Sequence, residues 1–229
     1  MAAMSNSGPR PDGEAAHWAD PAPSYDALAH SYAQQFLHEL DDKPFDRELL
    51  TRFAAVIALS ANAVHPVCDI GCGPGQIGAF VAERGPTVIG IDLSTGMVEE
   101  ARQTFPHLTF QQGDMTALPL EDGSLAGIVC FYALIHIHRS LVPMALGEMH
   151  RVLLPEGQLL VAVHRGQESL HATVMANEPA DLDATLFELD ELTRFVESAG
   201  FDIVEAHQRD PYEHEHPTPR LYVWARRAN

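Results

Sequence analysis

The hydrophobic residues in the first part of the chain recur with a helical period. Residues 1–23 are rich in Gly, Pro, Ala and Ser and predict a disordered tail. From Tyr25 to Leu40, apolar residues follow one another at three- and four-residue spacings. A second amphipathic stretch begins at Pro44, a residue that suits the first turn of a helix. The pattern therefore predicts two N-terminal helices within residues 24–62.

After Pro66 the period changes, and short apolar runs alternate with helical stretches. The runs are 67–70, 88–91, 108–111, 128–132 and 159–163, and the helical stretches lie near 76–84, 94–104 and 140–153. Strands that are apolar throughout, each followed by a helix, indicate a parallel sheet covered on both faces. A last helix over 190–199 precedes strand-like segments at 201–206 and 221–225, which predict a hairpin because no helical pattern separates them.

These elements predict a single α/β domain over residues 24–229. Its core would be a Rossmann-like, doubly wound, seven-stranded sheet, mostly parallel with a C-terminal antiparallel hairpin, in three α/β/α layers. One domain is ordinary for a chain of 229 residues. Residues 165–189 form a long connection, and connections of that length are often lids or binding segments.

Charge and cysteine content restrict the function. The chain has 32 acidic and 14 basic residues, a formal net charge of −18 that disfavours nucleic acid and membrane surfaces as partners. Neither a signal peptide nor a membrane-spanning apolar run is visible, which predicts a cytoplasmic protein. The three cysteines, Cys68, Cys72 and Cys130, have no C-x-x-C spacing, so we expect reduced, buried thiols.

The strongest local signal is a glycine-rich turn that follows the first strand of the sheet. Asp69, Gly71, Gly73 and Gly75 form a D-x-G-x-G-x-G pattern at the point where a helix begins. Glycines there allow a tight turn and close approach of the backbone to a ligand.

Two cofactor classes remain compatible with this turn. Residues 73–78 also satisfy G-x-G-x-x-G, and Asp92 follows Gly73 at the distance expected of a dinucleotide site, which leaves a nicotinamide-dependent oxidoreductase open. However, the carboxylate of Asp69 would repel a pyrophosphate and suit the ammonium group of an amino-acid ligand. Asp114, after the third strand, can accept a hydrogen bond from an adenine amine.

With these features the sequence resembles the class I S-adenosylmethionine-dependent methyltransferases, in their small-molecule branch. The resemblance covers residues 64–226, and the segment 148–157 is among its clearest marks. The usual Pro-Gly-Gly of the family appears here as Pro155-Glu156-Gly157. The resemblance implies S-adenosylmethionine as the cofactor and a small-molecule acceptor.

The resemblance also implies roles for individual residues along the chain. The methionyl end of the cofactor would be held by Asp69 and the backbone of Gly71 and Gly73, and its ammonium group by the Phe131 carbonyl. Asp92 would accept both ribose hydroxyls. Four residues would surround the adenine, namely Leu93, Met97, Asp114 and Met115. Tyr25 and Tyr32, in an N-terminal lid, would cover the site.

For the acceptor side, the resemblance and the residues together give weaker expectations. His136, after the fourth strand, is the candidate general base, although a histidine bonded to a backbone carbonyl is an equally ordinary interpretation. We expect His164 and Tyr212 to contact the acceptor, and residues 165–189 to form an acceptor-site insertion. The alternating residues 213–216 place too few ligands on one face for zinc, so no metal is predicted. A protein of the same fold that binds the cofactor without transferring a methyl group remains an alternative.

Overall fold

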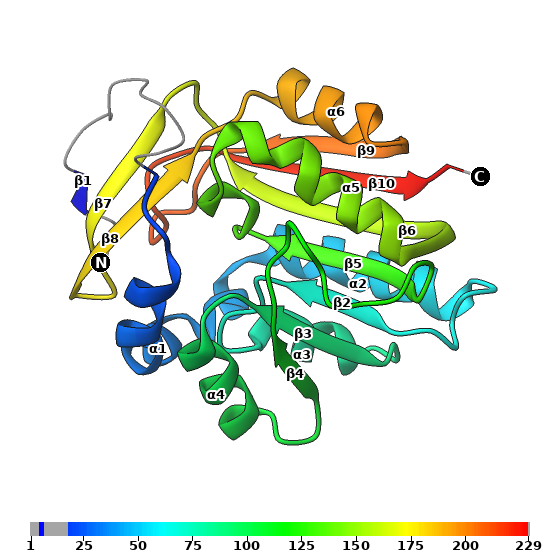
Figure 1. Ribbon diagram of the computed structural model, residues 1–229, viewed down its shortest axis with the longest axis horizontal. Helices are drawn as coiled ribbons and strands as arrows, with labels where there is room; N and C mark the ends of the chain where they lie inside the picture. Colours follow the sequence, from blue (N-terminus) through cyan, green and yellow to red (C-terminus); the bar gives the residue numbers. More distant parts are fainter. Residues whose placement is uncertain (1–4, 7–17, 229) are drawn as a thin grey trace.

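The computed structural model describes residues 5–6 and 18–228, and its centre is a seven-stranded sheet (Figure 1). The strands lie in the order β4-β3-β2-β5-β6-β10-β9. Their bounds are β2 (Val67–Ile70), β3 (Val88–Asp92), β4 (Thr109–Gln112), β5 (Leu125–Phe131), β6 (Leu153–His164), β9 (Phe201–Arg209) and β10 (Arg220–Arg227). Strands β2 to β6 run parallel, and β10 is antiparallel to both β6 and β9. The predicted fold class is confirmed.

Helices cover both faces of the sheet because its central strands are apolar throughout. One face packs against α2 (Pro44–Leu59) and α3 (Gln76–Ala82), and the other against α5 (Val142–Val152) and α6 (Leu189–Ser198) (Figure 1). Along β5, Ile128 and Cys130 contribute to the core under α5 and α6, whereas Val129 contributes to the core under α2 and α3. A period of two within an unbroken apolar run therefore builds both cores at once.

Helix α4 (Thr95–Thr104) packs against β3 and β4 at one edge of the sheet. Ser94 is its N-cap, and the Ser94 hydroxyl accepts a hydrogen bond from the Met97 backbone N–H at 3.1 Å. This cap makes α4 begin immediately after β3, and it fixes the direction in which the loop after β3 leaves the sheet.

The long connection over 165–189 contains regular secondary structure. It contains a hairpin of β7 (Ser169–Met175) and β8 (Glu178–Thr185), and β1 (Ser5–Asn6) pairs with β7 to complete a second, three-stranded sheet. Ala176 and Asn177 form the turn with φ angles of 50° and 65°, the left-handed conformation that a two-residue hairpin loop requires. In Figure 1 this hairpin lies beside α1.

The N-terminal segment is more structured than predicted. Helix α1 (Ala22–Phe36), a 3-10 helix (Glu39–Asp42) and α2 occupy the region of the two expected helices. Of the predicted disordered tail, residues 1–4 and 7–17 lie outside the described residues. The remainder packs against the domain, since the Trp18 indole N–H donates to the His136 carbonyl at 3.1 Å and the Ala19 N–H to the Asp183 carboxylate at 2.8 Å.

No helix within residues 18–228 combines the length and the apolar character needed to cross a membrane.

Candidate functional site

A cavity of about 610 Å³ opens at the carboxyl ends of the parallel strands. It lies where the strand order reverses, because β3 lies on one side of β2 and β5 on the other. Open α/β sheets bind their ligands at such a reversal. The cavity walls come from the glycine-rich turn, the ends of β3, β5 and β6, helix α1 and the loop before β10.

The glycine-rich turn owes its shape to close packing against the segment after β5. A Cβ atom on Gly71 would lie 2.1 Å from the Cβ of Ala133, and the φ angle of Gly71 is +69°. Glycine is therefore required at this position by both space and backbone conformation. The N–H groups of Gly71 and Cys72 donate to the Ile91 carbonyl at 2.7 and 3.1 Å, which ties the turn to the end of β3.

Asp92, the last residue of β3, lies at the cavity wall beside the glycine-rich turn. Its carboxylate accepts hydrogen bonds from the backbone N–H of Gly73 at 2.8 Å and of Ser94 at 2.9 Å. Burial raises the pKa of Asp92, and these two hydrogen bonds partly offset that rise. Each carboxylate oxygen retains a lone pair, so Asp92 can still accept hydrogen bonds from a ligand.

Asp69 occupies a different position from the other predicted cofactor residues. Its side chain is buried beneath the turn, where it accepts a hydrogen bond from the Gly78 N–H of α3 at 2.8 Å, and it does not line the cavity. Burial raises the pKa of Asp69 to about 7 despite that hydrogen bond. The structure thus places Asp69 as a support of the turn and of the start of α3.

The other residues expected to bind the cofactor line the cavity. Leu93, Met97, Met115 and Phe131 all contribute to its wall, and so does Asp114. One oxygen of Asp114 accepts hydrogen bonds from the Thr116 N–H and hydroxyl, both at 2.7 Å. Asp114 is exposed at the cavity rim, so its second oxygen is accessible to a ligand.

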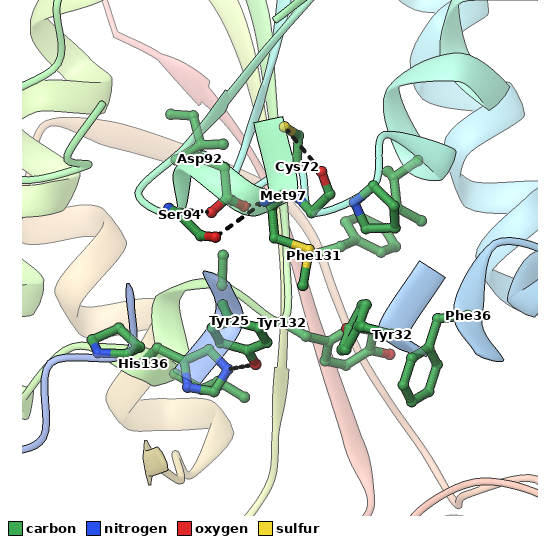
Figure 2. A pocket seen from close by; sticks show the side chains of 18 of the residues that line it. Tyr25, Tyr32, Phe36, Cys72, Asp92, Ser94, Met97, Phe131, Tyr132 and His136 are labelled. Atoms are coloured by element: carbon green, nitrogen blue, oxygen red, sulfur yellow. Dashed lines mark hydrogen bonds between the residues drawn. The ribbon is translucent and has the colours of Figure 1, made fainter. Parts of the chain in front are cut away.

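Helix α1 forms the cover of the cavity. Figure 2 shows Tyr25 and Tyr32 on one side of the cavity and Asp92 with Met97 on the other. The Asp26 carboxylate anchors α1 to the start of α4, where it accepts hydrogen bonds from the Ser94 hydroxyl at 2.6 Å and the Gly96 N–H at 2.9 Å. These hydrogen bonds, together with hydrogen bonds from Thr95, lower the pKa of Asp26.

Both ring nitrogens of His136 are engaged. Nδ1 lies 3.1 Å from the Asp183 carbonyl oxygen, and Nε2 lies 2.8 Å from the Tyr25 hydroxyl (Figure 2). A carbonyl only accepts, so Nδ1 carries the proton and Nε2 accepts a hydrogen bond from Tyr25. Burial lowers the pKa of His136 to about 4, so the imidazole is neutral at pH 7.

The structure separates the two residues that were expected to contact the acceptor. His164 ends β6 and lines the cavity, with Nδ1 at 2.7 Å from the Thr218 hydroxyl. Burial and the charge of Arg220 hold the pKa of His164 well below its usual value. Tyr212 does not line the cavity; its hydroxyl accepts from the Phe45 N–H at 3.2 Å, and its ring lies 4.1 Å from the Arg209 guanidinium.

A buried network of charged side chains was not predicted from the sequence. Arg209 donates to the carboxylates of Asp46 at 2.9 Å and Glu215 at 2.6 and 2.9 Å, and Lys43 lies 3.5 Å from Glu215. Although burial opposes ionisation, hydrogen bonds from Arg209 and the Tyr212 N–H lower the pKa of Glu215 to about 2. Asp46 and Arg209 are 163 positions apart in the chain, so no local spacing could have revealed their pairing.

Within the part of the chain that the structure describes, no cluster of three or more His, Cys, Asp or Glu side chains is arranged to hold a metal ion. His214, Glu215 and His216 line the cavity, and Glu215 also belongs to the charged network.

Comparison with known proteins agrees with this geometry. A methyltransferase-domain profile matches residues 67–157, from the start of β2 to the beginning of β6. The demethylmenaquinone methyltransferase of Beutenbergia cavernae is 35% identical over 62% of this chain and 57% of its own length. Residues 67–157 belong to the methyltransferase-domain family. The cofactor of the family is S-adenosylmethionine, so the nicotinamide alternative is not supported.

Solved structures of the same fold differ in their chemistry. The 1,6-didemethyltoxoflavin-N1-methyltransferase of Burkholderia thailandensis, with its substrate and S-adenosylhomocysteine bound, superposes with a TM-score of 0.63 at 20% identity, over 97% of this chain and 95% of its own. The cyclase SpnF superposes with a TM-score of 0.61 at 18% identity, over 80% of each chain. At these identities the likeness concerns the fold. The chain spans between 40% and 59% of the length of the first three curated relatives it matches.

Asp69 gives a testable pH dependence. Its pKa in the folded protein is about 7, above the value near 4 of an unfolded chain, so between those values only the folded state holds the proton. The folded state is thus stabilised below about pH 4, and this contribution is lost as the pH rises through 7. The unfolding free energy of the parent should therefore fall by about 2–3 kcal/mol between about pH 5 and pH 8. Asp69→Asn should lack this fall when both proteins are measured by urea unfolding. Equal pH dependence in parent and variant would show that Asp69 is not held protonated.

Proposed function

We propose that this protein transfers the methyl group of S-adenosylmethionine to an oxygen, nitrogen or carbon atom of a small-molecule acceptor. The observation that carries the proposal is Asp92 at the end of β3, because it meets the glycine-rich turn at the cavity with Leu93 and Met97 beside it. The transfer is an in-line displacement at carbon, so the protein has to align the acceptor and exclude water, and no covalent intermediate with the protein is needed.

The residues present fit the cofactor that the family uses. The Asp92 carboxylate would accept the ribose hydroxyls, Leu93 and Met97 would pack against the adenine, and the free oxygen of Asp114 would accept from the adenine amine. The Met115 N–H would meet an adenine ring nitrogen. What supports these roles is that all five residues line one cavity and present the required donors, acceptors or apolar surface.

The acceptor would be a small molecule bound under α1. The relatives named above act, by their names, on demethylmenaquinone and on 1,6-didemethyltoxoflavin. A nucleic acid is disfavoured because the net charge is −18 and acidic side chains, among them Glu39, Asp92 and Glu215, line the cavity. His164 at the end of β6 and the hairpin residue Met175 would form part of the acceptor wall.

An acceptor that arrives protonated would lose its proton to the pair formed by Tyr25 and His136. As the acceptor donates its proton to the Tyr25 oxygen, Tyr25 passes its own proton to Nε2 of His136. The Asp183 carbonyl on Nδ1 keeps the ring in the tautomer with a free lone pair on Nε2 and stabilises the imidazolium that forms. An acceptor that is already an anion would not need this pair.

A second candidate function is a reaction that uses the same cofactor site without methyl transfer. A cyclase shares the fold, which makes this reading specific enough to test. Mass-detected screening of a metabolite library with isotope-labelled S-adenosylmethionine separates the two, because only a methyltransferase releases S-adenosylhomocysteine together with a labelled product.

The cofactor assignment is tested by calorimetry on the parent and on Asp92→Ala. We expect S-adenosylhomocysteine to bind the parent and NAD to show no heat of binding. Asp92→Ala should weaken the binding of S-adenosylhomocysteine by about 2–4 kcal/mol, because charge-assisted hydrogen bonds to the ribose are lost in a desolvated site. Equal affinity in parent and variant would reduce Asp92 to a support of the turn, and tight binding of NAD alone would overturn the proposed function.

The proton pair is tested by His136→Gln and Tyr25→Phe, once screening has identified an acceptor. Each variant should lower the single-turnover rate by about 10²–10⁴-fold, because the acceptor's proton has no base to receive it. Affinity for S-adenosylhomocysteine should stay nearly unchanged, and the melting temperature serves as the control for folding. If both variants keep rates within a few-fold of the parent while binding the cofactor normally, the pair has no catalytic role.

A further inference from the structure

An ion pair lies beside the glycine-rich turn, at the wall of the cavity. Glu39 belongs to the 3-10 helix and Lys43 is the residue before α2, four positions later, and their side chains form an ion pair at the cavity wall. Both are largely buried, with 14% and 10% of the side chain exposed. Lys43 also lies 5.5 Å from the centre of the Tyr132 ring, just after β5.

Gln76 connects this ion pair to the turn. It is the first residue of α3, directly after the glycines, and its side-chain N–H₂ donates to Glu39 at 2.8 Å. Gln76 is only 9% exposed, and within the described residues its side-chain oxygen has no hydrogen-bond partner. An acceptor left unsatisfied in a buried place is unfavourable, and a ligand that brings a donor to the same cavity wall would remove that penalty.

The three side chains lie near the ends of β2 and β5, where the backbone of the turn faces the cavity. Among the described residues that line the cavity, Lys43 and Arg220 are the fixed cations. Arg220 begins β10, and its guanidinium lies 3.7 Å from the Glu215 oxygen that Lys43 also contacts. Its guanidinium donates to the His216 carbonyl and the Thr218 hydroxyl at 3.0 and 3.1 Å. Lys43 pairs with Glu39, which accepts from Gln76 at the start of α3, and this makes Lys43 the cation beside the turn.

A buried pair of opposite charges suits a ligand that carries both charges close together. The α-amino-acid end of S-adenosylmethionine carries an ammonium group and a carboxylate on one carbon. Asp69, the acid expected to meet that end, is turned toward the Gly78 N–H and does not reach the cavity. In a site shielded from water, charge-assisted hydrogen bonds are strong enough to compete with the existing ion pair.

We propose that Glu39, Lys43 and Gln76 form the subsite for the amino-acid end of S-adenosylmethionine. Lys43 binds the carboxylate, and Glu39 together with the side-chain oxygen of Gln76 accepts hydrogen bonds from the ammonium group. This subsite rests on the proposed function, since it presupposes that the nucleoside binds at Asp92. It assigns to the segment between α1 and α2 a part in cofactor binding, although Glu39 and Lys43 lie outside residues 67–157.

Three ligands that differ only at the amino-acid end test the subsite by calorimetry. S-adenosylhomocysteine carries both charged groups, its decarboxylated form keeps the amine alone, and 5′-methylthioadenosine has neither. Lys43→Met should weaken S-adenosylhomocysteine about 10- to 100-fold and leave the other two ligands unchanged. Glu39→Gln should weaken the two amine-bearing ligands and spare 5′-methylthioadenosine. Arg47→Met is the matched control, because it removes a cation from α2 that does not line the cavity, and it should change none of the affinities.

The outcomes separate the subsite from the proposed function. If S-adenosylhomocysteine binds the parent and Lys43→Met with equal affinity, the assignment of the subsite is wrong and the proposed function stands. If Lys43→Met weakens all three ligands equally, the residue supports the fold of the site and the subsite is again wrong. If no adenosyl ligand binds the parent, the proposed function fails and the subsite with it. Lys43→Arg, which keeps the charge, should restore most of the affinity that Lys43→Met loses.

Discussion

The contact between Gly71 and Ala133 is the constraint on which the rest of the site depends. It brings the turn after β2 against the segment after β5, at the reversal of strand order, and no side chain fits between them. Because the turn is held there, the Gly73 N–H reaches Asp92 at the end of β3, and Gln76 begins α3 beside the cavity. Three strand ends are thus fixed relative to one another before any ligand arrives, which is the preorganisation that a transfer reaction needs.

Helix α1 couples the cofactor side of the cavity to the side where the acceptor would lie. Asp26 joins it to Ser94 and Gly96 at the start of α4, and the Ser94 N–H also donates to Asp92. At the other side, Tyr25 holds His136 and Ser24 exchanges hydrogen bonds with the Asp181 backbone of β8. A ligand that displaces α1 at one side therefore disturbs hydrogen bonds at the other, so binding of the two ligands would be energetically linked.

The sequence predicted those features that depend on local pattern. The central strands β2, β3, β5 and β6 were recognisable because each contains a short apolar run. The glycine-rich turn and Asp92 were recognisable because the glycines and the acid have a fixed spacing. The hairpin of β7 and β8 was missed because its strands carry polar residues and a proline. Pro179 is tolerated there, since β8 is at the edge of its small sheet and need not donate from every backbone nitrogen. The pairings of Asp46 with Arg209 and of Tyr25 with His136 join positions that are distant in the chain, so neither periodicity nor residue spacing could predict them.

A crystal structure of the protein grown with S-adenosylhomocysteine would test the central claim most directly. The account predicts the nucleoside in the cavity between α1 and the ends of β2, β3 and β5, with both ribose hydroxyls within hydrogen-bond distance of the Asp92 carboxylate. It also predicts that Gly71 and Ala133 keep their contact. A nucleoside bound elsewhere, or a ribose that does not touch Asp92, would contradict the account.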